Sequence, residues 1–279
     1  MIEVKEIVKR YGDGTLALKR VTFSLNKKIT SIIGRNGAGK TTMLRILSTQ
    51  LLPTSGTAAI NGHDVIKDVR SIRRMAVSIP QESRPIGYAS ALDNVTLYLT
   101  ARGMGLQAAR DAAGNAIKKV GLWEVRNKSA DDLSGGMKRK IFMAMAIASK
   151  AEVVFLDEPT TGLDPLSRME VWSAIKSIKG QVILTTHYME EAQALSNDVL
   201  MIDKGRILAQ GSVKELLKPF KGMVRVESAR KVRNSYKVGR TYISYIRKSR
   251  AESWVMEGDI VKPITLDDLF IKGGVELEN

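Results

Sequence analysis

The sequence predicts an α/β fold built on a parallel sheet, and three observations point to it. Short apolar runs at 29–33, 153–156 and 181–186 are each followed by a segment with helical spacing. The run 153–156 is apolar at every position, as in a strand buried on both faces of a parallel sheet. A glycine-rich loop joins the run 29–33 to a helical segment, which is the context of phosphate-binding loops.

The composition is that of a globular protein without thiol chemistry. The chain has 279 residues, of which 44% are hydrophobic and 26% charged, so it can bury a large core. It contains no cysteine, which excludes disulfides, thiolate zinc sites and a thiol nucleophile. Because only two histidines are present, a histidine-rich metal centre is excluded as well.

Strand-like and helix-like segments alternate through residues 1–217. Short strands separated by turn signals are expected within residues 1–35, before the glycine loop and its helix. Strands at 57–62 and 75–79 flank a basic helix, and the pattern is then helical from about 89 to 135. The remaining expected elements are a helix ending near 150, strands at 153–156, 181–186 and 199–203, and helices at 166–178 and 188–195.

The character of the chain changes after Leu217, and a second, small unit is expected over residues 218–279. Strands are predicted at 224–226, 242–246 and 253–256, followed by a short helix within 264–274. Residues 218–250 hold eleven Lys or Arg against the single acid Glu227, out of a net charge of +15 for the chain. Such a segment fits an anionic membrane surface, nucleic acid, or the solvated face of a small β unit.

No segment predicts a membrane span or a secretion signal. A spanning helix needs about 20 consecutive apolar residues, whereas the longest uncharged stretch, residues 46–63, contains Ser, Thr, Gln, Pro and Asn. The first ten residues, MIEVKEIVKR, have no apolar core after their charges. The sequence therefore predicts a cytoplasmic protein that would reach a membrane only through a partner.

Residues 34–42 match the phosphate-binding pattern G-x-x-x-x-G-K-[ST]. Its glycines let backbone N–H groups turn onto phosphate oxygens, and the helix start adds partial positive charge. Lys40 is expected to reach the β- and γ-phosphates, and the Thr41 hydroxyl to bind Mg²⁺. The nucleotide-binding residues predicted in this loop are Gly34, Arg35, Asn36, Gly37, Ala38, Gly39, Lys40, Thr41 and Thr42.

Two carboxylates follow the apolar run 153–156. Asp157 is expected to lie beside the phosphate loop, where it can hold the Mg²⁺ shell. Glu158 is expected to act as the general base on an attacking water. The loop and the carboxylate pair together predict a nucleotide hydrolase.

A second anion-binding feature, Leu133-Ser134-Gly135-Gly136-Met137, opens the helix that ends near residue 150. Backbone amides and the helix dipole make such a start attractive to phosphate. Because the chain already has one phosphate loop, Ser134, Gly135 and Gly136 are expected to bind the γ-phosphate of a neighbouring subunit's nucleotide.

The order of these motifs resembles the ATP-binding cassette (ABC) family over residues 1–217, and LSGGM resembles its signature, with Met137 where glutamine is commoner. The resemblance implies that Tyr11 stacks on adenine and that Gln81 senses γ-phosphate and Mg²⁺. It further implies that Asp164 in GLDP belongs to the D-loop and that His187 is the switch histidine. The implied fold is a P-loop NTPase with a RecA-like parallel core, an N-terminal antiparallel β subdomain, an inserted helical subdomain at about 89–135, and a small β-rich C-terminal extension.

ATP hydrolysis is the chemistry that the resemblance implies, with ATP and Mg²⁺ bound. The implied catalytic residues are Lys40, Gln81, Glu158 and His187, and the implied Mg²⁺ ligands are Thr41, Gln81 and Asp157.

Further similarities point to the exporter branch that includes drug- and antibiotic-resistance pumps. They are LSGGMKRK, LDNVTLYLTARGMG, TTHYMEEA and TLDDLF. The expected protein is the ATPase subunit of an export-type transporter, peripheral on the cytoplasmic face of the membrane. Its expected partners are a separately encoded permease, a second cassette (its own copy or a paralogue) bound head to tail around two ATPs, and an anionic membrane surface.

The alternative is a soluble ABC ATPase that acts on ribosomes or nucleic acid through the basic segment 218–250. The chain carries one cassette, whereas translation-associated relatives usually carry two. The stretch between Lys40 and Ser134 has no heptad run, unlike the coiled coil of chromosome-associated relatives. Nucleic acid is therefore the less favoured partner.

Overall fold

The computed structural model describes residues 1–232, 234–256, 258–274 and 277–278. The chain divides into two compact units, Met1–Leu208 and Ala209–Asn279, so the boundary lies earlier than the change of composition after Leu217. Among the described residues, no helix combines the length and the apolar character needed to cross a bilayer.

A central sheet carries the functional loops of the first unit. Its strand order is β10-β9-β3-β8-β7-β6, and β3, β6, β7, β8 and β9 run parallel. Parallel strands bring their carboxyl ends to one edge of a sheet, and the ends of β3, β7 and β8 meet there, with Ile33 beside Thr186 and Asp157 beside Thr185. The strands are β3 (Ile29–Ile33), β6 (Ala76–Ile79), β7 (Val153–Asp157), β8 (Gln181–Thr186), β9 (Asp198–Asp203) and β10 (Arg206–Gly211).

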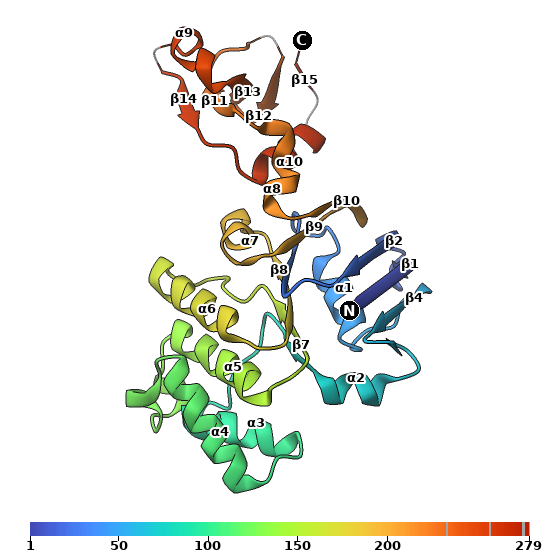
Figure 1. Ribbon diagram of the computed structural model, residues 1–279, viewed down its shortest axis with the longest axis vertical. Coiled ribbons are helices and arrows are strands. Elements are labelled where there is room, and N and C mark those ends of the chain that lie inside the picture. The colour runs from blue at the N-terminus through green and yellow to red at the C-terminus, as the bar shows by residue number, and fades with distance from the viewer. Residues whose placement is uncertain (233, 257, 275–276, 279) are drawn as a thin grey trace. The chain divides into compact units, whose positions relative to one another are not determined.

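The two faces of this sheet bury two separate cores, because successive side chains of a strand point to opposite faces. On β7, Val154 and Leu156 belong to the cluster formed with the helices α3, α4, α5 and α6. Val153 and Phe155 belong to the other cluster, which includes α1 and the N-terminal strands. Figure 1 shows these two groups of elements on opposite sides of the sheet. The helices are α1 (Lys40–Leu47), α3 (Ala91–Ala101), α4 (Leu106–Lys119), α5 (Gly135–Ser149), α6 (Pro165–Ser177) and α7 (Met189–Leu195).

An antiparallel sheet, ordered β2-β1-β4-β5, forms the N-terminal part of this unit. Its strands are β1 (Ile2–Arg10), β2 (Leu16–Leu25), β4 (Ser55–Ile60) and β5 (His63–Asp64), with α2 (Val69–Met75) following. The apolar side chains Ile2, Val4 and Ile7 of β1 are fully or almost fully buried and pack into the cluster that contains α1. Short 3₁₀ turns lie at Trp123–Val125 and Ala130–Asp132.

The second unit is a five-stranded antiparallel sheet, ordered β14-β11-β13-β12-β15. Among the described residues of this unit, the buried apolar side chains are Leu216, Phe220, Val226, Ile243, Leu266 and Phe270. Its elements are α8 (Val213–Leu216), β11 (Met223–Ser228), β12 (Ser235–Val238), β13 (Thr241–Arg247), α9 (Ala251–Trp254), β14 (Ile260–Lys262), α10 (Asp267–Gly274) and β15 (Leu277–Glu278), with 3₁₀ turns at Lys218–Phe220 and Lys248–Arg250.

One strand predicted for this unit is wrong. Residues 253–256 overlap the end of α9, and the N–H of Val255 donates to the carbonyl of Ala251 at 2.9 Å, which is a helical bond. The helical turn thus uses backbone groups that would otherwise form hydrogen bonds with a neighbouring strand. The strand β14 begins later, at Ile260.

Candidate functional site

The glycine loop between β3 and α1 is closed around Lys40. Gly39 has φ of +106°, and a Cβ there would lie 2.7 Å from the carbonyl oxygen of Ala17, so only glycine fits. The Lys40 Nζ donates to the carbonyl oxygens of Gly34 at 2.9 Å and Arg35 at 3.2 Å. Burial lowers the pKa of Lys40, and the nearby carboxylates of Glu158 and Asp157 oppose that shift. A buried ammonium therefore sits inside the loop, ready to pair with an anion.

Asp157 and Thr41 form a group of hard oxygen ligands at the same edge of the sheet. The Thr41 hydroxyl donates to Asp157 Oδ1 at 3.1 Å, and the Thr185 hydroxyl donates to the same oxygen. Carboxylate and hydroxyl oxygens suit Mg²⁺, which prefers oxygen donors shared with phosphates. Among the described residues, no group of three or more His, Cys, Asp or Glu could hold a metal by itself. The donors fit an ion that is held jointly by the chain and a bound nucleotide.

Glu158 lies at the centre of a group of polar side chains. Its Oε2 is 3.1 Å from His187 Nδ1 and accepts from Thr161 Oγ1 at 2.9 Å and from Gln81 Nε2 at 3.3 Å. Its Oε1 lies 3.8 Å from Lys40 Nζ. Gln81 thus contacts the predicted general base rather than Asp157, although the sequence suggests a metal-ligating role for it.

The backbone of Glu158 is unusual, because its φ of +45° lies in the left-handed region. A residue with a Cβ is seldom found there. The N–H of Glu158 donates to the Thr185 carbonyl at 3.1 Å and to Thr185 Oγ1 at 3.0 Å. Neighbouring groups therefore hold this conformation, which aims the carboxylate into the cavity next to the loop.

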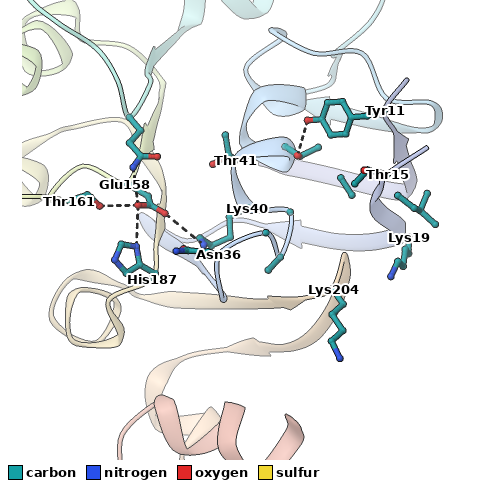
Figure 2. Close-up of a pocket in the computed structure, with 17 residues that line it drawn as sticks. Tyr11, Thr15, Lys19, Asn36, Lys40, Thr41, Glu158, Thr161, His187 and Lys204 are labelled. Atoms are coloured by element: carbon teal, nitrogen blue, oxygen red, sulfur yellow. Dashed lines mark hydrogen bonds and ion pairs between the residues drawn. The ribbon is translucent and has the colours of Figure 1, made fainter. Parts of the chain in front are cut away.

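That cavity has a volume of about 620 Å³, a size typical of small-molecule sites. Figure 2 shows Glu158, Thr161 and His187 on one side, Lys40 in the middle, and Tyr11 on the other side. The Tyr11 hydroxyl lies 3.0 Å from Thr42 Oγ1, and its ring is about one-third exposed. The predicted residues that line the cavity are Tyr11, Asn36, Gly37, Ala38, Gly39, Lys40, Thr41, Thr42, Gln81, Glu158 and His187.

The signature residues and Asp164 do not line this cavity. The Ser134 Oγ accepts from the N–H of Met137 at 3.3 Å and begins α5, while Gly135 lines a second cavity of about 470 Å³. Asp164 accepts from the N–H of Ser167 at 3.0 Å, and hydrogen bonds from Ser167 lower the pKa of Asp164. A single chain thus leaves the signature apart from its own phosphate loop.

Met137 is the signature position that departs from the family pattern. Its side chain is partly buried and packs against the core formed with the helices of the first unit. A thioether is suited to such apolar contacts. The side chain at this position therefore supports the packing of α5, while Ser134 and Gly135 at the start of the helix are exposed and Gly136 is buried.

Six further residues line the nucleotide-sized cavity without having been predicted. They are Thr15, Leu16, Ala17, Lys19, Thr161 and Lys204. The turn that follows β9 is tied to the phosphate loop, since the N–H of Gly205 donates to Ala38 O at 3.0 Å and the N–H of Lys19 donates to Gly205 O at 2.8 Å. Only Thr161 had a local signal in the sequence, a hydroxyl three residues after Glu158. The lysines are brought to the cavity by contacts between distant segments.

A family model described as "ABC transporter" matches residues 18–161. The chain is 35% identical over 223 residues to the daunorubicin resistance ATP-binding protein DrrA3 of Streptomyces coeruleorubidus. This alignment covers 77% of this chain and 69% of the relative. The chain is 38% identical over 220 residues to the doxorubicin resistance ATP-binding protein DrrA of Mycobacterium tuberculosis, with 77% of this chain and 66% of the relative covered. The chain thus matches about two thirds of the length of each relative.

Solved structures give the same picture of the fold. CbiO1 from Clostridium perfringens, part of the ABC transporter complex cbiONQ, superposes with a TM-score of 0.70 at 26% identity, covering 77% of this chain and 90% of that chain. A dimeric ATP-binding cassette in a post-hydrolysis state with ADP and Pi superposes with a TM-score of 0.69 at 26% identity, covering 76% of this chain and 98% of that chain. The P-loop cassette fold is therefore shared with proteins that bind adenine nucleotides and assemble in pairs.

Proposed function

The chain belongs to the ABC transporter family, and on that premise we propose that it is the ATP-hydrolysing subunit of an export-type transporter. One observation carries the proposal: Lys40, Glu158 and His187 converge on one cavity of about 620 Å³ at the carboxyl edge of a parallel sheet. An ammonium, a carboxylate and an imidazole in that arrangement can bind a nucleotide phosphate and activate a water.

The phosphates of ATP would lie against the glycine loop. Backbone N–H groups and the start of α1 offer partial positive charge, and Lys40 adds a full one. Tyr11, at the other side of the cavity, offers its ring to the adenine. Thr41, Asp157 and Gln81 would hold Mg²⁺, which when bound neutralises charge on the β- and γ-phosphate oxygens.

Glu158 is placed to take a proton from the attacking water. Its carboxylate keeps two hydrogen-bond donors, Thr161 and Gln81, on Oε2 and faces the cavity, while His187 lies 3.1 Å away. Phosphoryl transfer to water depends on positioning and charge more than on covalent help. His187 would orient the carboxylate and the water relative to the γ-phosphate.

A second cassette would complete each site. Because Ser134, Gly135 and Gly136 lie apart from the chain's own cavity, they are available to the nucleotide of a partner bound head to tail. ATP binding would close the pair, and hydrolysis would reopen it. The partner is a second copy of this chain or a paralogue, and Asp164 would help to link the two sites.

The export direction and the location rest on the relatives and on charge. The DrrA proteins are named for resistance to daunorubicin or doxorubicin, which suggests removal of a compound from the cell. A separately encoded permease would supply the membrane passage, with this subunit on the cytoplasmic face. The basic segment 218–250 would favour contact with an anionic membrane surface.

Affinity capture of the tagged full chain from its native cells, after mild detergent extraction and with or without nuclease, tests the proposal. We expect a stoichiometric membrane protein with several apolar spans, retained after nuclease treatment. Recovery of ribosomal proteins or nucleic acid that disappears with nuclease would contradict the transport function and favour the alternative of an ATPase acting on nucleic acid.

A further inference from the structure

Arg139 is a buried cation whose three hydrogen bonds in the structure all go to backbone carbonyls. It lies on α5, one turn after the signature glycines, and only 8% of its surface is exposed. Its Nε donates to Pro159 O at 2.7 Å, its Nη2 to Glu158 O at 2.9 Å, and its Nη1 to Gln81 O at 3.2 Å. One guanidinium thus joins the signature helix to the two segments that carry the predicted general base and the γ-phosphate sensor.

The bond to Glu158 acts on a residue whose backbone is strained. Its φ of +45° lies in the left-handed region, which is unfavourable for a residue with a Cβ. Thr185 holds the N–H of Glu158 from one side, and Arg139 holds its carbonyl from the other. Because both peptide groups are fixed, the direction in which the carboxylate leaves the backbone is fixed as well.

The bond to Gln81 acts on the side chain that contacts Glu158. Gln81 itself is exposed, and its Nε2 donates to Glu158 Oε2 at 3.3 Å. Arg139 ties the carbonyl of the same residue to the helix. Without that tie, an exposed loop residue would be free to move its amide away from the carboxylate.

Only an arginine can make this set of contacts. A guanidinium presents five donors in a rigid planar fork and remains charged when buried, whereas a lysine ammonium is a single compact charge. Burial lowers the pKa of Arg139, and the charges of Asp157 and Glu191 oppose that change. The contacts of Arg139 described above are all to backbone carbonyls and include no side-chain ion pair.

We propose that Arg139 is a positioning residue for ATP hydrolysis, which holds Glu158 and Gln81 in the geometry needed for attack by water. The inference rests on the proposed ATPase function. It concerns the rate of the chemical step and not nucleotide binding, because none of the atoms that Arg139 contacts belongs to the phosphate loop.

The neighbouring residue Lys140 provides a matched control. It lies on the same helix, is 7% exposed, and pairs with Glu170 of α6 at 2.8 Å, away from the catalytic segments. Arg139→Met and Lys140→Met each remove one buried cation of α5. The measurements are kcat, the Kd for ATP and the Tm of the full chain.

We expect Arg139→Met to lower kcat at least tenfold while the Kd for ATP changes less than threefold, and Lys140→Met to keep kcat within twofold of the wild type. Arg139→Lys should recover only part of the loss. In Arg139→Ala, millimolar guanidinium ions should raise kcat severalfold, and they should have no such effect on Lys140→Ala, since only the former leaves a guanidinium-shaped space beside the three carbonyls.

Two results would overturn the inference. One is equal kcat in Arg139→Met and Lys140→Met at equal Tm, which would reduce Arg139 to a packing residue. The other is a parallel loss of ATP affinity and kcat in Arg139→Lys. This variant keeps the positive charge and replaces Arg139→Met in the test if Arg139→Met does not fold. Absence of hydrolysis in the wild-type chain itself would instead refute the proposed function, so the two failures are distinguishable.

Discussion

Replacement of Glu158 by glutamine removes one negative charge from the centre of the site and little else. The amide has the same shape, so it can keep the contacts that Glu158 Oε2 makes with Thr161 at 2.9 Å and Gln81 at 3.3 Å. It cannot accept a proton from water. General acid–base catalysis contributes about 10²–10⁴-fold to a rate, so we expect kcat to fall by about that factor. At 1.36 kcal/mol per tenfold, the barrier rises by about 3–5 kcal/mol.

Nucleotide binding should respond in the opposite direction. The Glu158 carboxylate lies 3.8 Å from Lys40 Nζ and competes with phosphate for that ammonium. Its loss should leave the Kd for ATP unchanged or lower it. Single-turnover hydrolysis of radiolabelled ATP, together with equilibrium binding, separates the two quantities. A Glu158→Gln variant that turns over ATP within threefold of the wild-type rate would refute the general-base assignment.

Three other substitutions test the nucleotide site, the core and the titration of a buried acid. Base stacking on an aromatic ring is worth about 1–3 kcal/mol. Tyr11→Ala should therefore raise the Kd for ATP about tenfold in an equilibrium titration, and Tyr11→Phe should leave it unchanged. Equal Kd values for the two variants would exclude a stacking role for Tyr11. Phe155 is fully buried, and Phe155→Ala should cost about 3–5 kcal/mol in the free energy of unfolding measured with urea, whereas a loss below 1 kcal/mol would show that the core refills the space. Burial raises the pKa of the Glu191 carboxyl in the folded chain above its ordinary value of 4.5. The folded state therefore favours the protonated acid, and this contribution to the free energy of unfolding is fully present below pH 4.5. It is lost as the pH rises through the raised pKa. Glu191→Gln should therefore gain Tm relative to the wild type as the pH rises above 4.5, and a Tm difference independent of pH would contradict this.

The strands that the sequence predicts well are those buried on both faces. The run 153–156 is apolar throughout and the run 181–186 has a continuous apolar centre, and they become β7 and β8 with almost every residue buried. The strand β10 was not predicted, because its positions alternate between exposed and half-buried and none of them is fully buried. The strand β12 is short and carries exposed charge, so its partner β13 rather than its composition makes it a strand.

The residues of the candidate site also differ in how well the sequence predicts them. Residues such as Lys40 and Asp157 belong to continuous motifs, whose spacing along the chain carries the signal. Arg139 and Lys204 are brought to the site by contacts between segments far apart in the sequence, and Arg139 donates to a carbonyl 58 residues earlier. Nothing in the local pattern distinguishes such a residue from a surface cation, and only the hydrogen bonds from Arg139 to Gln81 and to the residues that follow β7 make it part of the site.

We expect each ATP site to be completed by the signature of a second cassette. Sedimentation of the Glu158→Gln full chain, with ATP and Mg²⁺ and then with ADP, measures whether two chains assemble around the nucleotide. We predict a species of twice the chain mass that holds two ATP molecules, and the mass of one chain with ADP. A single chain saturated with ATP, at concentrations well above the Kd, would contradict the account.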